Sequence, residues 1–242
     1  MFTRLAVEEI APTYLVVLRL FLASVLLGPI FIRMKDLALM KEQIPAILLL
    51  GIINAALPFF LYAYSAQELS AGMLSILNGT SPLFALIIAI IVFKQNTTIM
   101  QIFGLGLGFV GLLVFIGVDK LSFIFFPVLL CLIGAFCYAY SNNILFKLNH
   151  IRSSALASVT MISGFFFSLP LILVEPIAFS WDISPEIIFA IFFLGLVSTG
   201  ISFIAYVILL QRSSPVQASY NILGSRYRNL LGCYFLRRGD FS

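Results

Sequence analysis

Isolated polar side chains stand inside long apolar runs of this sequence, and they are of the types that recognise a small molecule. Arg19 lies inside such a run, and an ionisable side chain there must face a cavity or a partner because its exposure to lipid is costly. A guanidinium in a cavity would bind a carboxylate or phosphate by charge-assisted hydrogen bonds. The alternatives are a structural or gating arginine, one that reaches the nearby membrane interface, and one that pairs with Glu8 or Glu9.

Two stripes of polar residues follow a four-residue spacing, which places each stripe on one face of a helix. The first stripe is Asn54, Pro58 and Tyr62, and the second stripe is Ser198, Ser202 and Tyr206. We expect Asn54 and the two tyrosines to line a substrate cavity, and we assign the serines to helix packing. The alternative for both stripes is hydrogen bonding between helices with no ligand involved, worth roughly 0.6–2 kcal/mol per contact.

Two further polar faces carry candidate substrate-binding residues. Asn78 lies four residues before Pro82, and a proline inside a helix leaves the carbonyl four residues earlier without its donor. Freed backbone is tolerated at membrane depth only where neighbours or a water-filled cavity satisfy it. We therefore predict Pro82, and likewise Pro58, to be a kink or gating position, with a simple packing kink as the alternative. Tyr138 and Asn142 share a third polar face.

The residue types that bond-making chemistry requires are missing from the apolar runs. Between residues 14 and 210 every acidic residue, and the single histidine His150, falls in or beside a polar joint. A membrane protease would need paired aspartates, a Ser–His pair or a zinc-binding helix at depth, and a channel would show a filter or a charged ring. Cys131, Cys137 and Cys233 have no metal-ligand spacing. We expect no catalytic residue, metal or cofactor.

The elements that position these residues are membrane-spanning helices. The chain is 62% hydrophobic and only 10% charged, far from the roughly 45–50% and 25% of soluble domains. A helix needs about 20 apolar residues to cross the ~30 Å hydrocarbon layer. Seven such spans and an incomplete eighth from Val216 are predicted, and they are Tyr14–Ile32, Ile44–Ala66, Leu69–Phe93, Ile99–Val118, Phe123–Phe146, Ala155–Val174 and Ile187–Leu210. The predicted fold class is an all-α, polytopic transmembrane helical bundle.

Charge alternates along the joints between spans. The joints at 33–43, 94–98, 147–154 and 211–215 hold seven basic residues, whereas the intervening joints hold only Lys120. The positive-inside rule therefore predicts that these four joints are cytoplasmic in a multi-pass protein of the cell membrane. The remaining excess of basic residues falls in the last seventeen positions, so no patch for nucleic acid is predicted.

The sequence repeats itself weakly. A shift of 144 residues lays Gly51–Ser81 on Gly195–Ser225 without a gap, with identities that include Phe59/Phe203 and Tyr62/Tyr206. The second copy begins five predicted spans after the first, and because five is odd the copies must run in opposite directions through the membrane. An inverted-topology repeat is typical of secondary transporters, whose substrate site lies near the midplane between the repeats.

Three stretches carry a resemblance to a known family. They are EEIAPTYLVVLRLFLAS, YSAQELSAGMLSILNGTSPLFALI and QIFGLGLGFVGLLVF, and with them the chain from about Leu5 to Ser225 resembles the EamA family of the drug/metabolite transporter superfamily. The resemblance implies ten helices in two five-helix inverted repeats, cytoplasmic termini, and export or exchange of small metabolites. About eight helices would be present here: a first repeat at 1–118 that lacks its first helix, and an incomplete second repeat at 119–242.

The chain departs from the family pattern at two points. Gln95 replaces the usual glutamate, and Arg226 stands where the second copy should repeat Pro82. Arginine at the centre of a span costs about 2.5–3.5 kcal/mol on insertion scales, so we expect a reading-frame slip near Ser225.

Small residues let membrane helices approach closely, and a helix-packing face is predicted at Gly104, Gly108 and Gly111.

These features together predict a secondary transporter, an exporter or exchanger of small polar or amphipathic metabolites. It would work by alternating access around a midplane site, in contact with the lipid bilayer and a small-molecule substrate. Exchange or facilitated diffusion is favoured because proton coupling usually uses an acidic residue or histidine inside a span. The alternatives are a non-transporting membrane subunit of the same fold acting as a homodimer, an inactive truncated copy, and an intramembrane enzyme.

Overall fold

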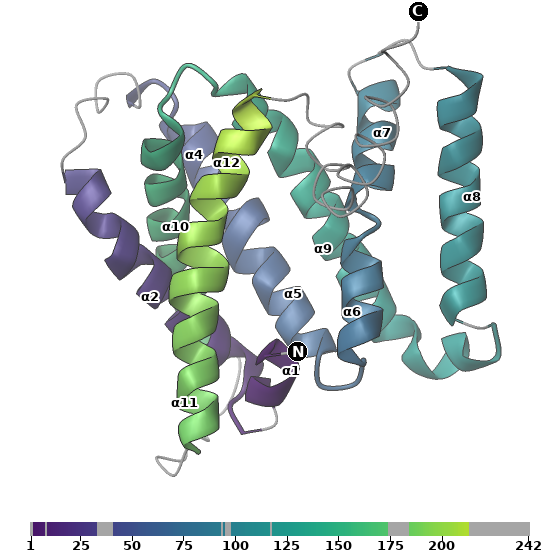
Figure 1. The fold of residues 1–242 in the computed structure, drawn as a ribbon, viewed down its shortest axis with the longest axis horizontal. Helices are drawn as coiled ribbons and strands as arrows, with labels where there is room; N and C mark the ends of the chain where they lie inside the picture. The colour runs from purple at the N-terminus through teal and green to yellow at the C-terminus, as the bar shows by residue number, and fades with distance from the viewer. Residues whose placement is uncertain are drawn as a thin grey trace, which may run out of the picture.

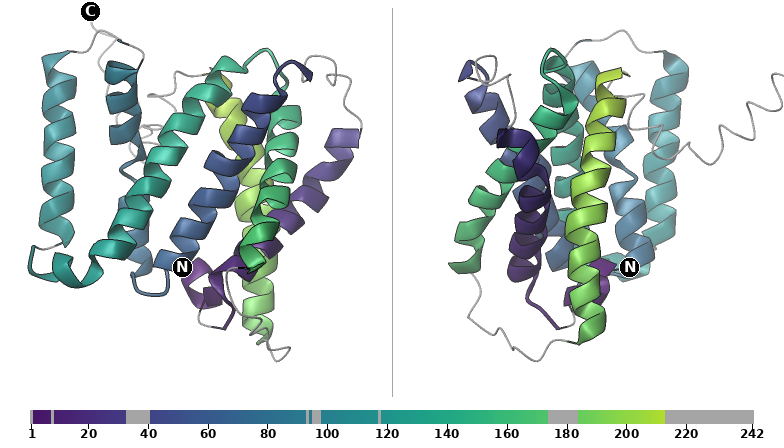
Figure 2. Two further views of the ribbon diagram at one scale, coloured as in Figure 1. Left: turned by 180° about the vertical axis from the view of Figure 1, so that it is seen from behind. Right: turned by 60° about the vertical axis from the view of Figure 1, so that its left-hand side comes forward.

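The computed structural model describes residues 2–7, 9–32, 41–92, 94, 98–116, 118–173 and 184–212 (Figures 1 and 2). All regular secondary structure in these ranges is helical, which confirms the predicted fold class. Within them, six helices are long and apolar enough to cross a membrane. A seventh predicted span is also a helix, in which the apolar stretch Ile99–Leu112 is shorter. The predicted eighth span and the proposed frame slip lie outside the described residues.

The helices follow the predicted spans closely. Several spans are built from more than one helical segment, because π-helical and 3₁₀ turns interrupt the α-helix. The segments are α1 (Phe2–Val7), α2 (Pro12–Ile32), α4 (Ile44–Leu50), η1 (Gly51–Ala56), α5 (Leu57–Ser65), α6 (Ala71–Asn78), α7 (Ser81–Ile91), α8 (Ile99–Ile116), α9 (Val118–Lys147), α10 (Ser153–Ser168), η2 (Leu169–Leu173), α11 (Pro185–Phe192), η3 (Phe193–Ile201) and α12 (Ser202–Arg212).

The predicted span Leu69–Phe93 is present as Ala71–Ile91, which is long and apolar enough to cross a membrane, but it is not one continuous helix, because the chain breaks between α6 and α7. Pro82, in the first turn of α7, has no N–H to give to the carbonyl of Asn78. The Ser81 hydroxyl donates to that carbonyl instead, at 2.8 Å. The Thr80 hydroxyl donates to the carbonyl of Leu77 at 2.6 Å. The break therefore satisfies its own freed carbonyls, as a break at membrane depth must.

Two spans contain a π-helical segment, η1 in one and η3 in the other. The π-helix is rare, and it occurs frequently at functional sites. The shift that relates the two sequence copies lays Gly51–Ala56, the whole of η1, on Gly195–Gly200 within η3. The two halves therefore carry the same unusual backbone feature at matching positions.

Each π-segment packs against the other half of the chain through a glycine. A Cβ on Gly51 would lie 2.8 Å from the backbone nitrogen of Gly164 and would overlap the hydroxyl of Ser163, both in α10. A Cβ on Gly195 would lie 2.6 Å from the Cβ of Leu22 and 3.2 Å from the carbonyl oxygen of Arg19, both in α2. Arg19 and Ser163 are themselves 144 residues apart, so the two contacts are reciprocal.

Helices α2 and α10 lie side by side, on the side of the bundle away from α8 (Figure 1). The Ser24 hydroxyl donates to the carbonyl of Met161 at 3.1 Å, and the Ser158 hydroxyl donates to the carbonyl of Leu27 at 2.9 Å. These side chains bond across the pair rather than to water, as hydroxyl groups between membrane helices commonly do. Leu20 of α2 and Met161 of α10 both belong to the main apolar core.

Successive spans run in alternate directions, so every second joint lies at the same end of the bundle (Figures 1 and 2). The end of α7, the start of α8, the α9–α10 connection and the last residue of α12 lie at the upper end in Figure 1. Lys94, Lys147, Arg152 and Arg212 belong to these positions. The basic residues of these three joints that the structure describes thus share one end of the molecule, and the cytoplasmic orientation of the joints stays a prediction.

Helix α8 stands at the edge of the bundle (Figure 1), and this position limits the predicted glycine packing face. A Cβ on Gly108 would lie 2.8 Å from a methyl carbon of Leu83 in α7. A Cβ on Gly104 or on Gly111 would meet no described atom within 4 Å. Among the described residues only Gly108 of the three thus approaches a neighbouring helix, and the packing face at Gly104 and Gly111 stays a prediction.

Candidate functional site

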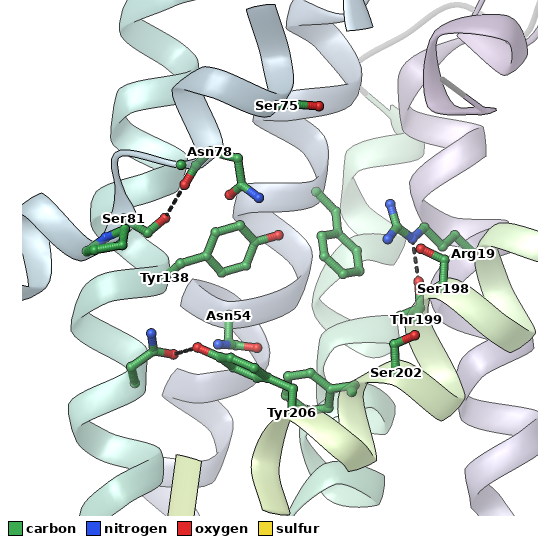
Figure 3. Close-up of a pocket in the computed structure, with 15 residues that line it drawn as sticks. Arg19, Asn54, Ser75, Asn78, Ser81, Tyr138, Ser198, Thr199, Ser202 and Tyr206 are labelled. Atoms are coloured by element: carbon green, nitrogen blue, oxygen red, sulfur yellow. Dashed lines mark hydrogen bonds between the residues drawn. The ribbon is translucent and has the colours of Figure 1, made fainter. Parts of the chain in front are cut away.

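A cavity of about 460 Å³ lies where the two halves of the chain meet (Figure 3). Its wall is built from α2, η1 and α5, from the break between α6 and α7, and from α9, η3 and α12. Six of the predicted substrate-binding residues and one predicted kink residue line it, and they are Arg19, Asn54, Asn78, Tyr138, Asn142, Tyr206 and Pro82. The structure therefore brings together side chains that are far apart in the sequence.

Arg19 reaches the cavity from α2, and π-segment η3 holds its side chain. Its Nε–H donates to the hydroxyl oxygen of Thr199 at 2.5 Å. The Thr199 hydroxyl donates in turn to the carbonyl of Leu194, five residues earlier, at 2.7 Å. The guanidinium carbon also lies 4.1 Å from the centre of the Phe59 ring, a distance at which a cation is attracted to the ring face.

The alternative pairing of Arg19 with Glu9 is wrong. The Glu9 carboxylate instead accepts hydrogen bonds at 3.0 Å from the backbone N–H and from the hydroxyl of Ser184. Glu8, the other carboxylate considered as a partner of Arg19, lies outside the described residues. Arg19 points toward the cavity from one wall, and Tyr138 points toward it from the opposite wall (Figure 3).

Helix α9 supplies partners for residues of both stripes. The Tyr206 hydroxyl donates to the Asn142 side-chain oxygen at 2.5 Å, and the Asn54 amide donates to the Ser141 hydroxyl oxygen at 2.6 Å. Asn54 and Asn142 are buried, with exposed fractions of 2% each. Because buried polar groups are costly without partners, these bonds fix the cavity floor between η1, α9 and α12.

The two stripes lie differently around the cavity. Ser198, Ser202 and Tyr206 all line it, whereas Asn54 is the single member of the first stripe that does. The expectation that the serines serve helix packing is therefore not met, since both are exposed on the cavity wall. The Ser202 hydroxyl donates to the carbonyl of Val197, in η3 of the same span, at 2.9 Å.

Tyr62 and Pro58 lie outside the cavity wall. The Tyr62 ring is stacked on the Tyr138 ring, with centroids 6.1 Å apart and an angle of 17° between the planes. Its other side approaches Gly134, where a Cβ would lie 2.9 Å from a ring carbon. The Tyr62 hydroxyl is buried and has no hydrogen-bond partner among the described residues. Pro58 is buried in the first turn of α5, directly after η1.

Sequence reasoning missed several residues of the wall, among them Phe59, Phe203 and Thr199. Phe59 and Phe203 line the cavity, and an apolar residue in an apolar helix gives no sign of this by itself. Their identity under the shift of 144 residues was the available signal. Thr199 corresponds to Ala55 under the same shift, so its contact with Arg19 leaves no mark in the repeat.

Comparison with known proteins gives consistent matches over the chain. The model of the EamA-like transporter family matches residues 1–117. The "Uncharacterized transporter YoaV" of Bacillus subtilis (strain 168) is 24% identical over 227 residues, which cover 91% of this chain and 77% of that protein. The "Uncharacterized transporter in sor 3'region" of Acidianus ambivalens is 24% identical over 190 residues, which cover 78% of this chain and 71% of that protein.

A solved crystal structure shares the fold. It matches with a TM-score of 0.61 at 16% sequence identity, and the match covers 94% of this chain and 83% of the other. At this identity the likeness concerns the arrangement of helices alone. The helical architecture is thus one that an experimentally determined structure also adopts.

Proposed function

Residues 1–117 place the chain in the EamA-like transporter family, and from this premise we propose that it is a secondary transporter of small polar or amphipathic metabolites. The chain is a multi-pass membrane protein of transporter type. The finer proposal is alternating access, in which the repeat at 1–118 rocks against the repeat at 119–242 around the central cavity. The basic joints then face the cytoplasm.

The observation that carries this proposal is the cavity itself. It has about 460 Å³, a size within the roughly 300–1,000 Å³ range of small-molecule sites. Its wall combines aromatic rings with isolated amide, hydroxyl and guanidinium groups contributed by both halves. A few convergent polar groups in an apolar wall fix the orientation of a small ligand.

The helices around the cavity support the transport mechanism. The break between α6 and α7 ends at Ser81 and Pro82, which line the cavity, and binding sites of secondary transporters are typically formed by discontinuous helices. The reciprocal packing of η1 on α10 and of η3 on α2 is what two inverted repeats would produce. We propose exchange or facilitated diffusion, because the lining residues in the described part of the chain are free of the Asp, Glu or His that proton coupling uses.

A pair of tryptophan variants tests the transporter proposal even while the substrate is unidentified. Ser202→Trp places a bulky ring in the cavity, whereas Ile201→Trp places the same ring on the adjacent position, which is 57% exposed on the outside of the bundle. Cells that produce the wild-type chain, each variant or none are compared by mass spectrometry of metabolites in the medium. Equal membrane levels of the three proteins are checked first.

We expect the wild type and Ile201→Trp to change the amount of at least one small metabolite in the medium. Ser202→Trp should abolish that change because the cavity is filled. Identical profiles with and without the wild-type protein would contradict transport. Equal activity of Ser202→Trp and the wild type would instead show that the substrate takes another path.

A further inference from the structure

We propose that the cavity binds organic monoanions, with a carboxylate of the ligand on the guanidinium of Arg19 and an aromatic or aliphatic body against the ring-lined wall. The inference rests on the proposed function only in taking the bound anion to be the transported substrate. Its basis is the placement of Arg19, the charge of the cavity wall and the distribution of aromatic rings.

The contacts of Arg19 leave its binding edge open to the cavity. Its Nε–H is engaged by Thr199, and one face of the guanidinium lies on the ring of Phe59. The other N–H donors of arginine are on Nη1 and Nη2, in a rigid plane that matches the two oxygens of a carboxylate. No hydrogen bond joins these Nη groups to another described residue. The Thr199 contact therefore fixes the Arg19 side chain and leaves its Nη1 and Nη2 donors for a ligand.

The charge of the wall selects an anion. Arg19 is the one ionisable cation among the residues that line the cavity, and no carboxylate is among them in the described part of the chain. A charge held at membrane depth is costly unless it is paired. A bound carboxylate removes that cost by forming charge-assisted hydrogen bonds, so anion binding is favoured by the electrostatics of the empty site.

The number of charges selects a monoanion. A single guanidinium balances one negative charge, and a dianionic phosphate ester would bring a second charge with no cation to meet it. A ligand ammonium group would likewise find amide and hydroxyl groups but no carboxylate among the described lining residues. Cations and dianions are therefore disfavoured relative to a simple carboxylate.

The shape of the site sets the body of the ligand. Aromatic rings line the cavity at Phe59, Phe203, Tyr138 and Tyr206. Offset or edge-on contacts with such rings stabilise an aromatic ligand beyond the burial of its area. The amides of Asn54 and Asn142 face the same space from the floor. An aryl-substituted carboxylate therefore fits both the ring wall and the guanidinium.

Three matched probes test this assignment on the purified full chain in detergent. Hydrocinnamate, its neutral amide hydrocinnamamide and the cation phenylpropylamine share one aryl chain and differ in charge. Binding is measured as the ligand-dependent rise in Tm, which follows from binding to the folded state alone. We expect hydrocinnamate to raise the Tm of the wild type, and the amide and the amine to bind roughly 10- to 100-fold more weakly, as the loss of a charged hydrogen-bonded pair implies.

Variants of Arg19 then locate the binding. Arg19→Gln should lose the preference for hydrocinnamate over its amide, and Arg19→Lys should keep the preference with lower affinity because its ammonium is a point charge without the fork. Arg212→Gln is the matched control, since this arginine is exposed at the end of α12, and it should bind as the wild type does. If Arg19→Gln does not fold, the three probes on the wild type and Arg19→Lys still decide the question.

Flux separates this inference from the transporter proposal. Proteoliposomes loaded with each probe are assayed for efflux. Arg19-dependent binding of hydrocinnamate without any flux would sustain the anion site and count against transport by this chain. Flux of the amide or the amine, with no Tm preference for hydrocinnamate, would sustain transport and overturn the anion site. Equal Tm shifts with all three probes would also overturn it.

Discussion

The first stripe and the second stripe match under the sequence shift but differ in their surroundings. Ser198, Ser202 and Tyr206 all line the cavity, whereas Tyr62 is stacked behind Tyr138. The hydroxyl of Tyr206 is bonded to Asn142. The hydroxyl of Tyr62 is buried with no partner in the described part of the chain. Matching positions in the two halves thus have unequal roles in this conformation.

This inequality is what one state of an alternating-access carrier would show. If two inverted repeats exchange conformations between the two states, the stripe that is packed away in one state faces the cavity in the other. The unpartnered hydroxyl of Tyr62 is then a group whose hydrogen bond is made in the opposite state. The glycine contacts of η1 and η3, by contrast, are reciprocal in this state and should matter equally in both halves.

The largest effects are expected where the halves are alike. Gly51→Ala and Gly195→Ala each place a Cβ within 2.9 Å of a neighbouring helix, so each should lower the free energy of unfolding by about 1–3 kcal/mol through overpacking. The measurement is unfolding of the purified protein in mixed detergent micelles. Gly104→Ala is the control, since its Cβ would meet open space, and it should cause no loss. A large effect of only one of the two glycine variants would break the proposed equivalence.

An intermediate effect is expected where the halves differ most. Tyr206→Phe removes the donor to the Asn142 side chain and should lower the free energy of unfolding by about 1–2 kcal/mol. Tyr62→Phe removes a hydroxyl that has no partner in the described structure and should be neutral or slightly stabilising. The same micelle unfolding assay measures both. Equal losses for the two variants would show that Tyr62 has a bond in this state and would contradict the comparison.

The smallest difference in the free energy of unfolding is expected between variants at the first residue of each stripe, Asn54 and Ser198. Asn54→Ala breaks the buried bond to Ser141 and should lower the free energy of unfolding by about 1 kcal/mol. Ser198→Ala alters a residue exposed to the cavity and should change it by less than about 0.5 kcal/mol. Both variants are measured by unfolding at matched detergent composition. A larger loss for Ser198→Ala than for Asn54→Ala would reverse the ranking of the two positions.

The spans and seven of the fifteen residues that line the cavity could be predicted because their signals are strong. Apolar runs define membrane helices, and a polar side chain such as Arg19 or Asn142 inside such a run has to face something other than lipid. The repeat also pointed to Tyr206 through its match with Tyr62. These residues can be predicted from the sequence because exposing a polar side chain to lipid costs free energy, and not because of local helix propensity.

The orientation of individual helix faces could not be predicted from spacing. Four-residue periodicity assumes a regular α-helix, but the first residue of each stripe lies in a π-helical segment, η1 or η3, so the spacing alone does not fix which face each residue presents. The break between α6 and α7 follows from Pro82, yet its sequence also permitted a simple kink. The contact of Thr199 with Arg19 joins residues 180 positions apart, and no local pattern encodes it.

The most direct test of alternating access between the halves is the side of the membrane from which each stripe is reached. Single cysteines at Tyr62→Cys and Tyr206→Cys, in a chain whose three native cysteines are replaced, are labelled with an impermeant thiol reagent in vesicles of both orientations. We predict that the two cysteines react from opposite sides, and that hydrocinnamate changes their rates together. Reaction of both cysteines from the same side would contradict an exchange of roles between the two halves.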